Sequence, residues 1–307
     1  MPAVSVIIPA FNSARYIGDA LASIEDQTLR DIEVILVDDG SSDGTIQEAQ
    51  RYAASLDLTV LQQGNRGPSA ARNAGIRRAR GRYCALLDAD DLMLPELLAT
   101  GCALLDANPG VGLVVTDIIT FDDKGTIHEG HWKLSGTQDV LERLLIENFI
   151  TTSAVMAPTR CLIEAGLFPE HRRVAEDYEL WLNLAARWEV VLVDRPLVRY
   201  RYTPGSLSSN KLYSARCALD VIESFWRHHP QHRSTHPQIC RRSLARHTRN
   251  AGAAALAEGA RITALRYLLT AMRCEPGAPE TWKELLKALL PSRRHHRGAV
   301  PNPMKIP

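Results

Sequence analysis

Three carboxylates follow an apolar run within four residues of one another. The run 83–87 is apolar, and Asp88, Asp90 and Asp91 come directly after it. Carboxylates this close repel one another, and removing them from water is costly unless a cation lies among them. Oxygen ligands on a short turn suit Mg²⁺ or Mn²⁺, which often share one or two carboxylates with substrate phosphates. The cluster therefore predicts a divalent-metal site; the alternative is an exposed acidic turn that caps a helix starting near Pro95.

A second acidic cluster, the pair Asp38 and Asp39, follows the apolar run 34–37. These carboxylates can accept hydrogen bonds from a nucleobase N–H or a ribose hydroxyl. Ser41, Ser42 and Asp43 follow, and such residues are typical helix N-caps. We expect Asp39 to be functional and residues 41–43 mainly to cap a helix.

A glycine-rich loop leads into a predicted helix between Gly64 and Gly75, and Arg72 lies in the first turns of that helix. Backbone N–H groups at a helix N-terminus, together with an arginine, favour an anion such as a diphosphate. An arginine near the start of a surface helix is also common, and that remains the alternative for Arg72.

A third acidic cluster, the pair Glu176 and Asp177, precedes apolar residues at positions 178, 181, 182 and 185. This spacing predicts an amphipathic helix with both acids at its N-terminal end. The helix dipole favours the ionised form of a carboxylate there, as a general base requires. The alternative is an acidic first turn that only stabilises the helix.

Alternating strands and helices must position these clusters. Apolar runs at 4–8, 34–37, 58–61 and 83–87 predict strands. Helices are predicted at 13–27, from the loop 38–44 to about residue 54, at 68–79 and after Pro95. This alternation indicates a parallel sheet with helices on both faces. Such sheets bind ligands beyond the carboxyl ends of their strands, where the acidic clusters at 38–39 and 88–91 lie.

The rest of the chain divides into a mixed segment, a helical region and a basic tail. Strands are predicted at 111–116, 152–157, 189–193 and 197–201, a hairpin turn at 122–125, and helices at 137–147 and 177–187. We predict an α/β domain over 1–210, helices over 211–290 and a flexible basic tail over 291–307. One helix pair around 249–290 resembles a single tetratricopeptide unit, a weak signal because arrays need about three repeats.

Composition and charge place the chain among globular proteins. Hydrophobic residues make up 45% and charged residues 23% of 307 residues, with a net charge of +1. Residues 1–213 contain 20 Lys and Arg against 29 Asp and Glu, whereas the last 94 residues contain 16 against 6. An acidic body and a basic end indicate different partners for the two parts. The scattered cysteines and the absence of a signal-like N-terminus predict a cytoplasmic protein, with the basic helices as a candidate contact to the inner membrane face or a protein.

Together these segments resemble glycosyltransferase family 2, whose members have the GT-A fold. The resemblance is carried by Val4–Asn12, Ser23–Thr28, Val37–Asp43, Asn65–Gly67, Ala71–Asn73, Leu87–Asp91, Glu176–Asp177 and Tyr200–Ser206. It implies a Rossmann-like mixed sheet with the predicted C-terminal helices appended. It also implies an inverting transfer of a sugar from a nucleotide-diphospho-sugar to an acceptor hydroxyl, in polysaccharide, glycolipid or other glycan assembly.

The resemblance also implies a role for each matching residue. The nucleotide and sugar would be bound by Pro9, Phe11, Asp39, Arg72 and Asp88, the metal (Mn²⁺ or Mg²⁺) by Asp90, and Asp177 would be the catalytic base. The expected donor is a UDP-sugar, and the expected acceptor is a glycan or a lipid-linked glycan. Many relatives have a histidine where this chain has Thr203, which puts a late contact to the metal or diphosphate in doubt.

Two other functions fit part of the sequence. A nucleotidyltransferase would also bind a nucleotide on acidic loops, but it would release pyrophosphate. A non-catalytic nucleotide-sugar-binding protein would need the same binding residues without the base. A nicotinamide dehydrogenase would need G-x-G-x-x-G after the first strand, where Pro9, Ala10, Phe11 and Asn12 stand instead. We expect no nucleic-acid partner.

Overall fold

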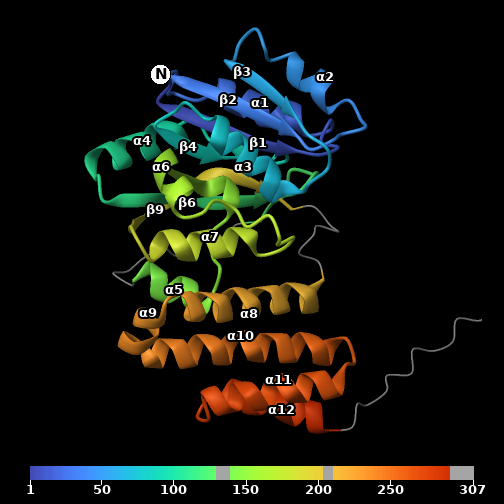
Figure 1. The fold of residues 1–307 in the computed structure, drawn as a ribbon. Coiled ribbons are helices and arrows are strands. Elements are labelled where there is room, and N and C mark those ends of the chain that lie inside the picture. The colour runs from blue at the N-terminus through green and yellow to red at the C-terminus, as the bar shows by residue number, and fades with distance from the viewer. Residues whose placement is uncertain (129–138, 203–209, 291–307) are drawn as a thin grey trace, which may run out of the picture.

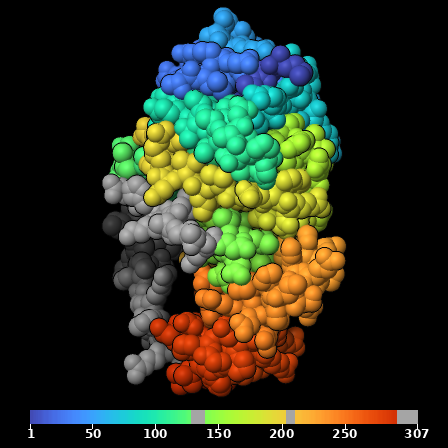
Figure 2. Space-filling view, turned by 90° about the vertical axis from the view of Figure 1, so that its left-hand side faces the viewer, coloured from blue at the N-terminus to red at the C-terminus, as the bar shows by residue number. Residues whose placement is uncertain are grey.

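A computed structural model describes residues 1–128, 139–202 and 210–290. Its centre is a nine-stranded mixed sheet with the strand order β3-β2-β1-β4-β8-β6-β9-β5, to which β7 adds by pairing with β6. The sheet lies at one end of an elongated molecule, and helices stack away from it towards the C-terminus (Figures 1 and 2). Among the described residues, no helix is both long enough and apolar enough to cross a membrane.

The first four strands form the parallel half of the sheet, as the sequence predicts. They are β1 (Val4–Ala10), β2 (Ile32–Asp38), β3 (Leu58–Gln62) and β4 (Tyr83–Leu86). The connecting helices are α1 (Ile17–Glu25), α2 (Thr45–Gln50) and α3 (Pro68–Arg78). Parallel neighbours need such crossovers because a tight hairpin cannot return the chain in the same direction.

The second half of the sheet mixes strand directions. It contains β5 (Leu92–Met93), β6 (Val111–Phe121), β7 (Ile127–His128), β8 (Val155–Pro158) and β9 (Glu189–Arg201). β8 is antiparallel to both β4 and β6, whereas β6 and β9 are parallel. The helices of this half are α4 (Leu97–Ala107), α5 (Val140–Ile146), α6 (Thr159–Glu164) and α7 (Glu176–Ala185), with a 3₁₀ turn at Thr152–Ala154.

Two hydrophobic cores lie on opposite faces of the sheet because side chains alternate along each strand. Along β1, Val6 and Ile8 belong to the core under α1, α2 and α4, whereas Ile7 belongs to the core under α3, α5, α6 and α7. The second core also contains residues of α8 (Lys211–His228), among them Phe225 and Trp226. The C-terminal helices are therefore anchored to the helical layer of the α/β part.

The C-terminal region is helical, as expected. It contains α8 (Lys211–His228), α9 (Pro230–Thr235), α10 (Pro237–Ala257), α11 (Arg261–Cys274) and α12 (Pro279–Leu289). α10 and α11 approach closely at Gly252, where an added Cβ would lie 2.8 Å from the Cγ of Leu268. The domain boundary near residue 210 and the tetratricopeptide-like unit stay predictions. The tail 291–307 lies outside the described residues.

Several predicted boundaries and two short elements differ from the sequence expectations. Residues 152–154 of the predicted strand 152–157 form a 3₁₀ turn, and the predicted strand 111–116 continues to Phe121. The predicted strands 189–193 and 197–201 form one strand, β9, whose pairing with β6 shifts register around Asp117. Pro196 pairs at this irregularity, where a residue without an N–H group is tolerated. The sequence analysis did not predict α6 or β5, which are only six and two residues long.

Gly75 sets how closely α3 packs on the sheet. A Cβ at this position would lie 2.5 Å from the Cγ2 of Ile7 and 3.3 Å from the Cγ2 of Val37. We expect Gly75→Ala to lower the free energy of unfolding by about 1–3 kcal/mol, because overpacking forces backbone shifts. Urea denaturation measures this. Gly64→Ala is the matched control, since a Cβ there meets nothing within 4 Å; equal losses in both variants would contradict close packing as the cause.

Candidate active site

The strand register brings the acidic clusters to one edge of the sheet. Ala10 pairs with Asp38 at the ends of β1 and β2, and Ile7 pairs with Leu86 at the end of β4. Backbone hydrogen bonds continue this pairing beyond the strands, from the Asp39 N–H to the Ala10 carbonyl at 2.8 Å and from the Leu87 N–H to the Ile7 carbonyl at 3.0 Å. The chain therefore places the start of the 88–91 turn and the 38–39 pair around the end of β1.

Asp39 holds the loop that leads into α3. Its Oδ1 accepts hydrogen bonds from the Gln63 Nε2 at 2.7 Å and the Arg66 N–H at 2.8 Å, and its Oδ2 accepts one from the Gly67 N–H at 2.7 Å. Gly67 has a φ of 91°, a conformation that other residues rarely adopt. The carboxylate is buried, so it shapes the loop at the N-terminus of α3.

Arg72 joins two of the predicted clusters. Its guanidinium donates to the Asp88 Oδ1 at 2.8 Å and to the Glu176 Oε1 at 3.0 Å, and it lies 5.1 Å from the centre of the Phe168 ring. The side chain is 7% exposed. Asp88, Glu176 and Asp177 raise the pKa of this guanidinium against the opposing effect of burial. Arg72 is therefore a buried cation between the turn at 88–91 and the first turn of α7.

The loop before α7 is fastened to α3 next to Arg72. The Asn73 side chain donates to the Phe168 carbonyl at 2.8 Å and accepts from the Phe168 N–H at 2.9 Å. The Asn73 Nδ2 is also 3.1 Å from the Glu170 Oε1. These bonds place the Phe168 ring against the guanidinium of Arg72.

Asp177 lies in the first turn of α7, as predicted. Its Oδ1 accepts from the Tyr178 N–H at 2.6 Å, and the Asn148 Nδ2 lies 3.5 Å from both carboxylate oxygens. Burial and the charge of Glu176 raise the pKa of Asp177 to about 7, although Arg72 and these hydrogen bonds oppose the rise. A carboxyl group with a pKa near neutral pH suits proton transfer.

The acids after β4 have different surroundings. Asp91 is buried; it accepts from the Ser153 hydroxyl at 2.5 Å and from the Arg201 N–H at 2.8 Å. Burial and the charges of Asp88 and Asp90 raise the pKa of Asp91 well above its ordinary value. Asp88 and Asp90 are only partly buried. Asp91 therefore supports the turn from within, while the other two carboxylates remain accessible.

Arg201 also holds this turn, and the sequence analysis did not single it out. It donates through Nε to the Asp90 carbonyl at 2.9 Å. Its guanidinium lies 4.7 Å from the ring centre of Tyr16 and 4.5 Å from that of Phe121. Its sequence signals were its place at the end of a predicted strand and within the family segment Tyr200–Ser206. Neither signal reveals the contacts, because the contacted aspartates are about 110 residues away in the chain.

Pro9 and Phe11 lie at the end of β1 beside Asp39. Pro9 is the penultimate residue of β1 and is partly buried, whereas the Phe11 side chain is 49% exposed. Asn12 follows with a φ of 50°, and its Oδ1 accepts from the Ser42 N–H at 2.9 Å. An exposed ring at this edge can stack on a planar ligand. Thr203 lies outside the described residues.

The donor set after β4 is compatible with a hard divalent cation. Asp88 and Asp90 offer only oxygen, the ligand type that Mg²⁺ and Mn²⁺ prefer. Within residues 1–128, 139–202 and 210–290, no three His, Cys, Asp or Glu side chains are arranged to hold a metal by themselves. A cation there would take its other ligands from phosphate and water, as Mg²⁺ commonly does.

Known proteins share both sequence and fold with this chain. Residues 5–163, just over half of the chain, match the model of the family described as Glycosyl transferase family 2. An uncharacterized glycosyltransferase of Rickettsia felis is 30% identical over 207 residues, which is 66% of this chain and 33% of that protein. The chain thus spans about a third or less of the length of the first relatives it matches. The E. coli UDP-Glc:alpha-D-GlcNAc-diphosphoundecaprenol beta-1,3-glucosyltransferase WfgD is 25% identical, covering 72% of this chain and 86% of its own length.

Solved structures show the same fold. S. aureus TarS 1-349 superimposes with a TM-score of 0.70 at 21% identity, over 90% of this chain and 81% of that one. The same protein in complex with UDP-GlcNAc gives a TM-score of 0.62 at 18% identity, with coverage of 94% and 90%. The mannosyltransferase PcManGT from Pyrobaculum calidifontis, in complex with GDP-Man and Mn²⁺, gives 0.58 at 21% identity, with coverage of 94% and 84%. The expected GT-A-like fold with C-terminal helices is confirmed, and the chain belongs to glycosyl transferase family 2.

Proposed function

We propose that this chain transfers a sugar, with inversion, from a nucleotide-diphospho-sugar to an acceptor hydroxyl in glycan assembly. One observation carries the proposal. The buried guanidinium of Arg72 bridges Asp88, beside the predicted metal site, and Glu176, the neighbour of Asp177. Asp88, the acid on the side of the sugar donor, and Asp177, whose carboxyl group has a pKa of about 7, thus belong to one connected site.

The proposed roles follow from this arrangement. Pro9 and Phe11 line the nucleotide pocket, and Asp39 contacts the base from its position directly after β2. The buried Arg72 lies near the diphosphate, and Asp88 binds the ribose or the sugar. The relatives support a UDP-sugar donor, since the WfgD name contains UDP-Glc and one TarS structure contains UDP-GlcNAc.

Charge and proton transfer define the reaction. The acceptor oxygen forms a bond to C1 of the sugar from the face opposite the leaving group, and the bond from C1 to the phosphate oxygen breaks. The nucleoside diphosphate leaves with the bonding electrons, and the acceptor proton passes to the Asp177 carboxylate. Inversion at C1 follows from attack on the opposite face.

A divalent cation fits this scheme at Asp90, with Asp88 beside it. Bound there, Mn²⁺ or Mg²⁺ would neutralise the charge that develops on the departing diphosphate. Asp91 and Arg201 hold the backbone of this turn in place through the Ser153 and Asp90 contacts described above. The PcManGT structure, which contains GDP-Man and Mn²⁺, supports the use of a divalent metal.

The Asp90 carboxylate is expected to be required for metal-assisted nucleotide binding. Asp90→Ala should reduce the Mn²⁺-dependent gain in UDP affinity at least tenfold, because that carboxylate would hold the cation against the diphosphate. Isothermal titration of UDP with and without Mn²⁺ measures the gain. Asp194→Ala, at an exposed position of β9, is the control. An unchanged Mn²⁺ effect in Asp90→Ala would exclude Asp90 as the metal ligand.

Product analysis tests the reaction itself. Incubation with UDP-sugars and Mn²⁺ should release UDP, and the new glycosidic linkage should have the opposite anomeric configuration to the donor. Release of pyrophosphate would instead identify a nucleotidyltransferase, the closest alternative. Binding without any turnover across a panel of UDP-sugars and acceptors would indicate a nucleotide-sugar-binding protein.

We also propose a cytoplasmic location and a lipid-linked or glycan acceptor. The WfgD name, which contains a diphosphoundecaprenol acceptor, supports the lipid-linked case. The basic helices after residue 210 are the proposed contact to an inner membrane surface or a protein. Co-sedimentation of the full chain with anionic vesicles, at low and high salt, distinguishes these two contacts.

A further inference from the structure

A cavity of about 210 Å³ lies between the α/β part and the C-terminal helices, beside the proposed base. Its walls come from the end of α5 and the residues after it, from the start of α7, and from α8 and α10. α10 contributes Arg246, His247 and Asn250. No family motif in the sequence analysis includes these three residues.

The cavity is linked directly to Asp177. Asn148 and Tyr178 both line it. The Asn148 Nδ2 is 3.5 Å from each Asp177 oxygen, and the Tyr178 N–H donates to the Asp177 Oδ1 at 2.6 Å. A molecule whose hydroxyl meets Asp177 would therefore extend next to residues that line this cavity.

The cavity is polar but balanced in charge. The Arg246 Nη2 pairs with the Glu147 Oε2 at 2.6 Å, and the Arg246 Nε is buried with no hydrogen-bond partner among the described residues. That Nε is closed to solvent, whereas the Arg246 side chain as a whole is 36% exposed, so a ligand in the cavity would meet the accessible part of the guanidinium. Burial lowers the pKa of His247 to about 4, which leaves its ring neutral at neutral pH. This balance favours a neutral ligand rich in hydroxyl groups over an anion.

The size of the cavity and its apolar lining restrict the kind of ligand that it can hold. Ile146, Ala215 and Ala218 are apolar residues among those that line it. Sites for drug-sized ligands usually measure about 300–1,000 Å³, so about 210 Å³ suits a single ring.

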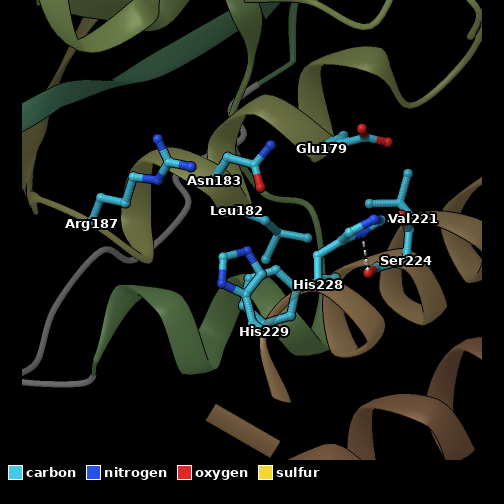
Figure 3. A pocket seen from close by; sticks show the side chains of 9 residues that line it. Glu179, Leu182, Asn183, Arg187, Val221, Ser224, His228 and His229 are labelled. Carbon is cyan, nitrogen blue, oxygen red and sulfur yellow. Dashed lines mark hydrogen bonds between the residues drawn. The ribbon is translucent and has the colours of Figure 1, made fainter. Parts of the chain in front are cut away.

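A larger cavity of about 270 Å³ lies between α7 and α8 (Figure 3). It is lined by Glu179, Leu182 and Asn183 of α7 and by Arg187 just after that helix, all beyond the turn that carries Asp177. None of the described residues that line it has a hydrogen bond to Asp177 like that of Asn148, so the smaller cavity is the better candidate for a role in the reaction.

We propose that the smaller cavity is an acceptor subsite that holds one neutral sugar ring, with Arg246 and Asn250 as specificity-determining residues. This inference rests on the proposed glycosyl transfer. It assigns part of the acceptor site to α10, so the C-terminal helices take part in substrate recognition. The apolar lining residues would contact a face of the ring, and the accessible part of the Arg246 guanidinium and the Asn250 amide would bind its hydroxyl groups.

Binding of simple glycosides to the full chain tests the subsite. The probes are p-nitrophenyl α- and β-glycosides of glucose, galactose, mannose and N-acetylglucosamine, measured by saturation-transfer NMR with UDP and Mn²⁺ present. We expect at least one probe to bind, and Arg246→Gln and Asn250→Ala to weaken it at least tenfold. Arg242→Gln, the same change at an exposed position of α10, should alter the affinity less than twofold.

The outcomes separate this inference from the proposed function. If no glycoside binds, or if it binds wild type and both variants equally, the subsite assignment is wrong. Competition by inorganic phosphate would overturn the neutral-ring assignment. Asn250→Ala changes an exposed side chain, so it remains informative even if Arg246→Gln fails to fold. UDP release from UDP-sugars is measured separately; its absence in wild type would reject the proposed function, whereas its presence without glycoside binding would reject only the subsite.

Discussion

Asp177→Asn is expected to lower kcat by about 10²–10⁴-fold while UDP affinity changes less than threefold. The amide keeps the shape of the side chain, but it cannot accept the proton of the acceptor hydroxyl, and a positioned base contributes about this factor to the rate. In the proposed reaction UDP lies on the opposite side of the reacting carbon from Asp177, so the substitution should leave UDP affinity nearly unchanged. Steady-state kinetics with UDP release as the readout, and titration with UDP, measure the two effects.

The pH dependence of the wild-type enzyme should report the same group. The pKa of Asp177 is raised to about 7, so the carboxylate is mostly protonated below that pH. The value of kcat/KM, which reflects groups of the free enzyme, should therefore fall about tenfold per pH unit below about 7 and level off above it. A profile that stays flat down to pH 5 would contradict a base with this pKa.

Stability gives an independent measure of the Asp177 pKa. A carboxyl group whose pKa is higher in the folded than in the unfolded state stabilises the fold fully below its unfolded value. That contribution is lost as the pH rises through about 7. The melting temperature of Asp177→Asn should therefore rise relative to wild type between pH 5 and pH 8. Asp194→Asn, an exposed position on β9, should show neither this trend nor a loss of kcat; equal effects in both variants would exclude the proposed role of Asp177.

Arg72→Met is expected to lower the free energy of unfolding by about 3 kcal/mol, near the lower end of the range for breaking a buried ion pair. The change leaves Asp88 and Glu176 without the guanidinium that contacts both at 2.8 and 3.0 Å. It also removes a positive charge that lowers the pKa of Asp177. Urea denaturation at pH 7 measures the loss of stability.

Arg72→Lys separates charge from geometry. Lysine keeps the positive charge, but a single ammonium cannot reproduce the fork that contacts both carboxylates. We expect stability between those of wild type and Arg72→Met, with kcat/KM reduced at least tenfold. In the Met variant the pH profile should shift to higher pH, because the pKa of Asp177 rises without the guanidinium.

Arg78→Met is the matched control for Arg72→Met. Arg78 lies in the last turn of α3 and is exposed, so its loss should change the free energy of unfolding by less than about 0.5 kcal/mol. A similar loss in the Arg72 and Arg78 variants would show that the bridge between the two carboxylates contributes nothing specific.

Local sequence patterns predicted the first four strands and the helix after the Asn65–Gly67 loop. Apolar runs such as 34–37 reveal buried parallel strands by themselves, because both faces of such strands are covered. The sequence analysis also placed Asp177 in the first turn of a helix, where the structure has it. The two-residue strand β5 could not be predicted, because the strand it pairs with among the described residues is β9, about 105 residues further along the chain.

By itself, the sequence determined which chemical groups stand at the ends of the strands and helices, because turn and cap preferences act over a few residues. Only the tertiary structure decided which of these charged groups contact one another. Arg72 contacts Glu176 across 104 positions of the chain, and Arg201 reaches Asp91 across 110. The raised pKa of Asp177 likewise depends on burial and on neighbours that meet only when the sheet has formed. No local pattern contains that information, since desolvation and Coulomb energies depend on distances in space rather than on spacing along the chain.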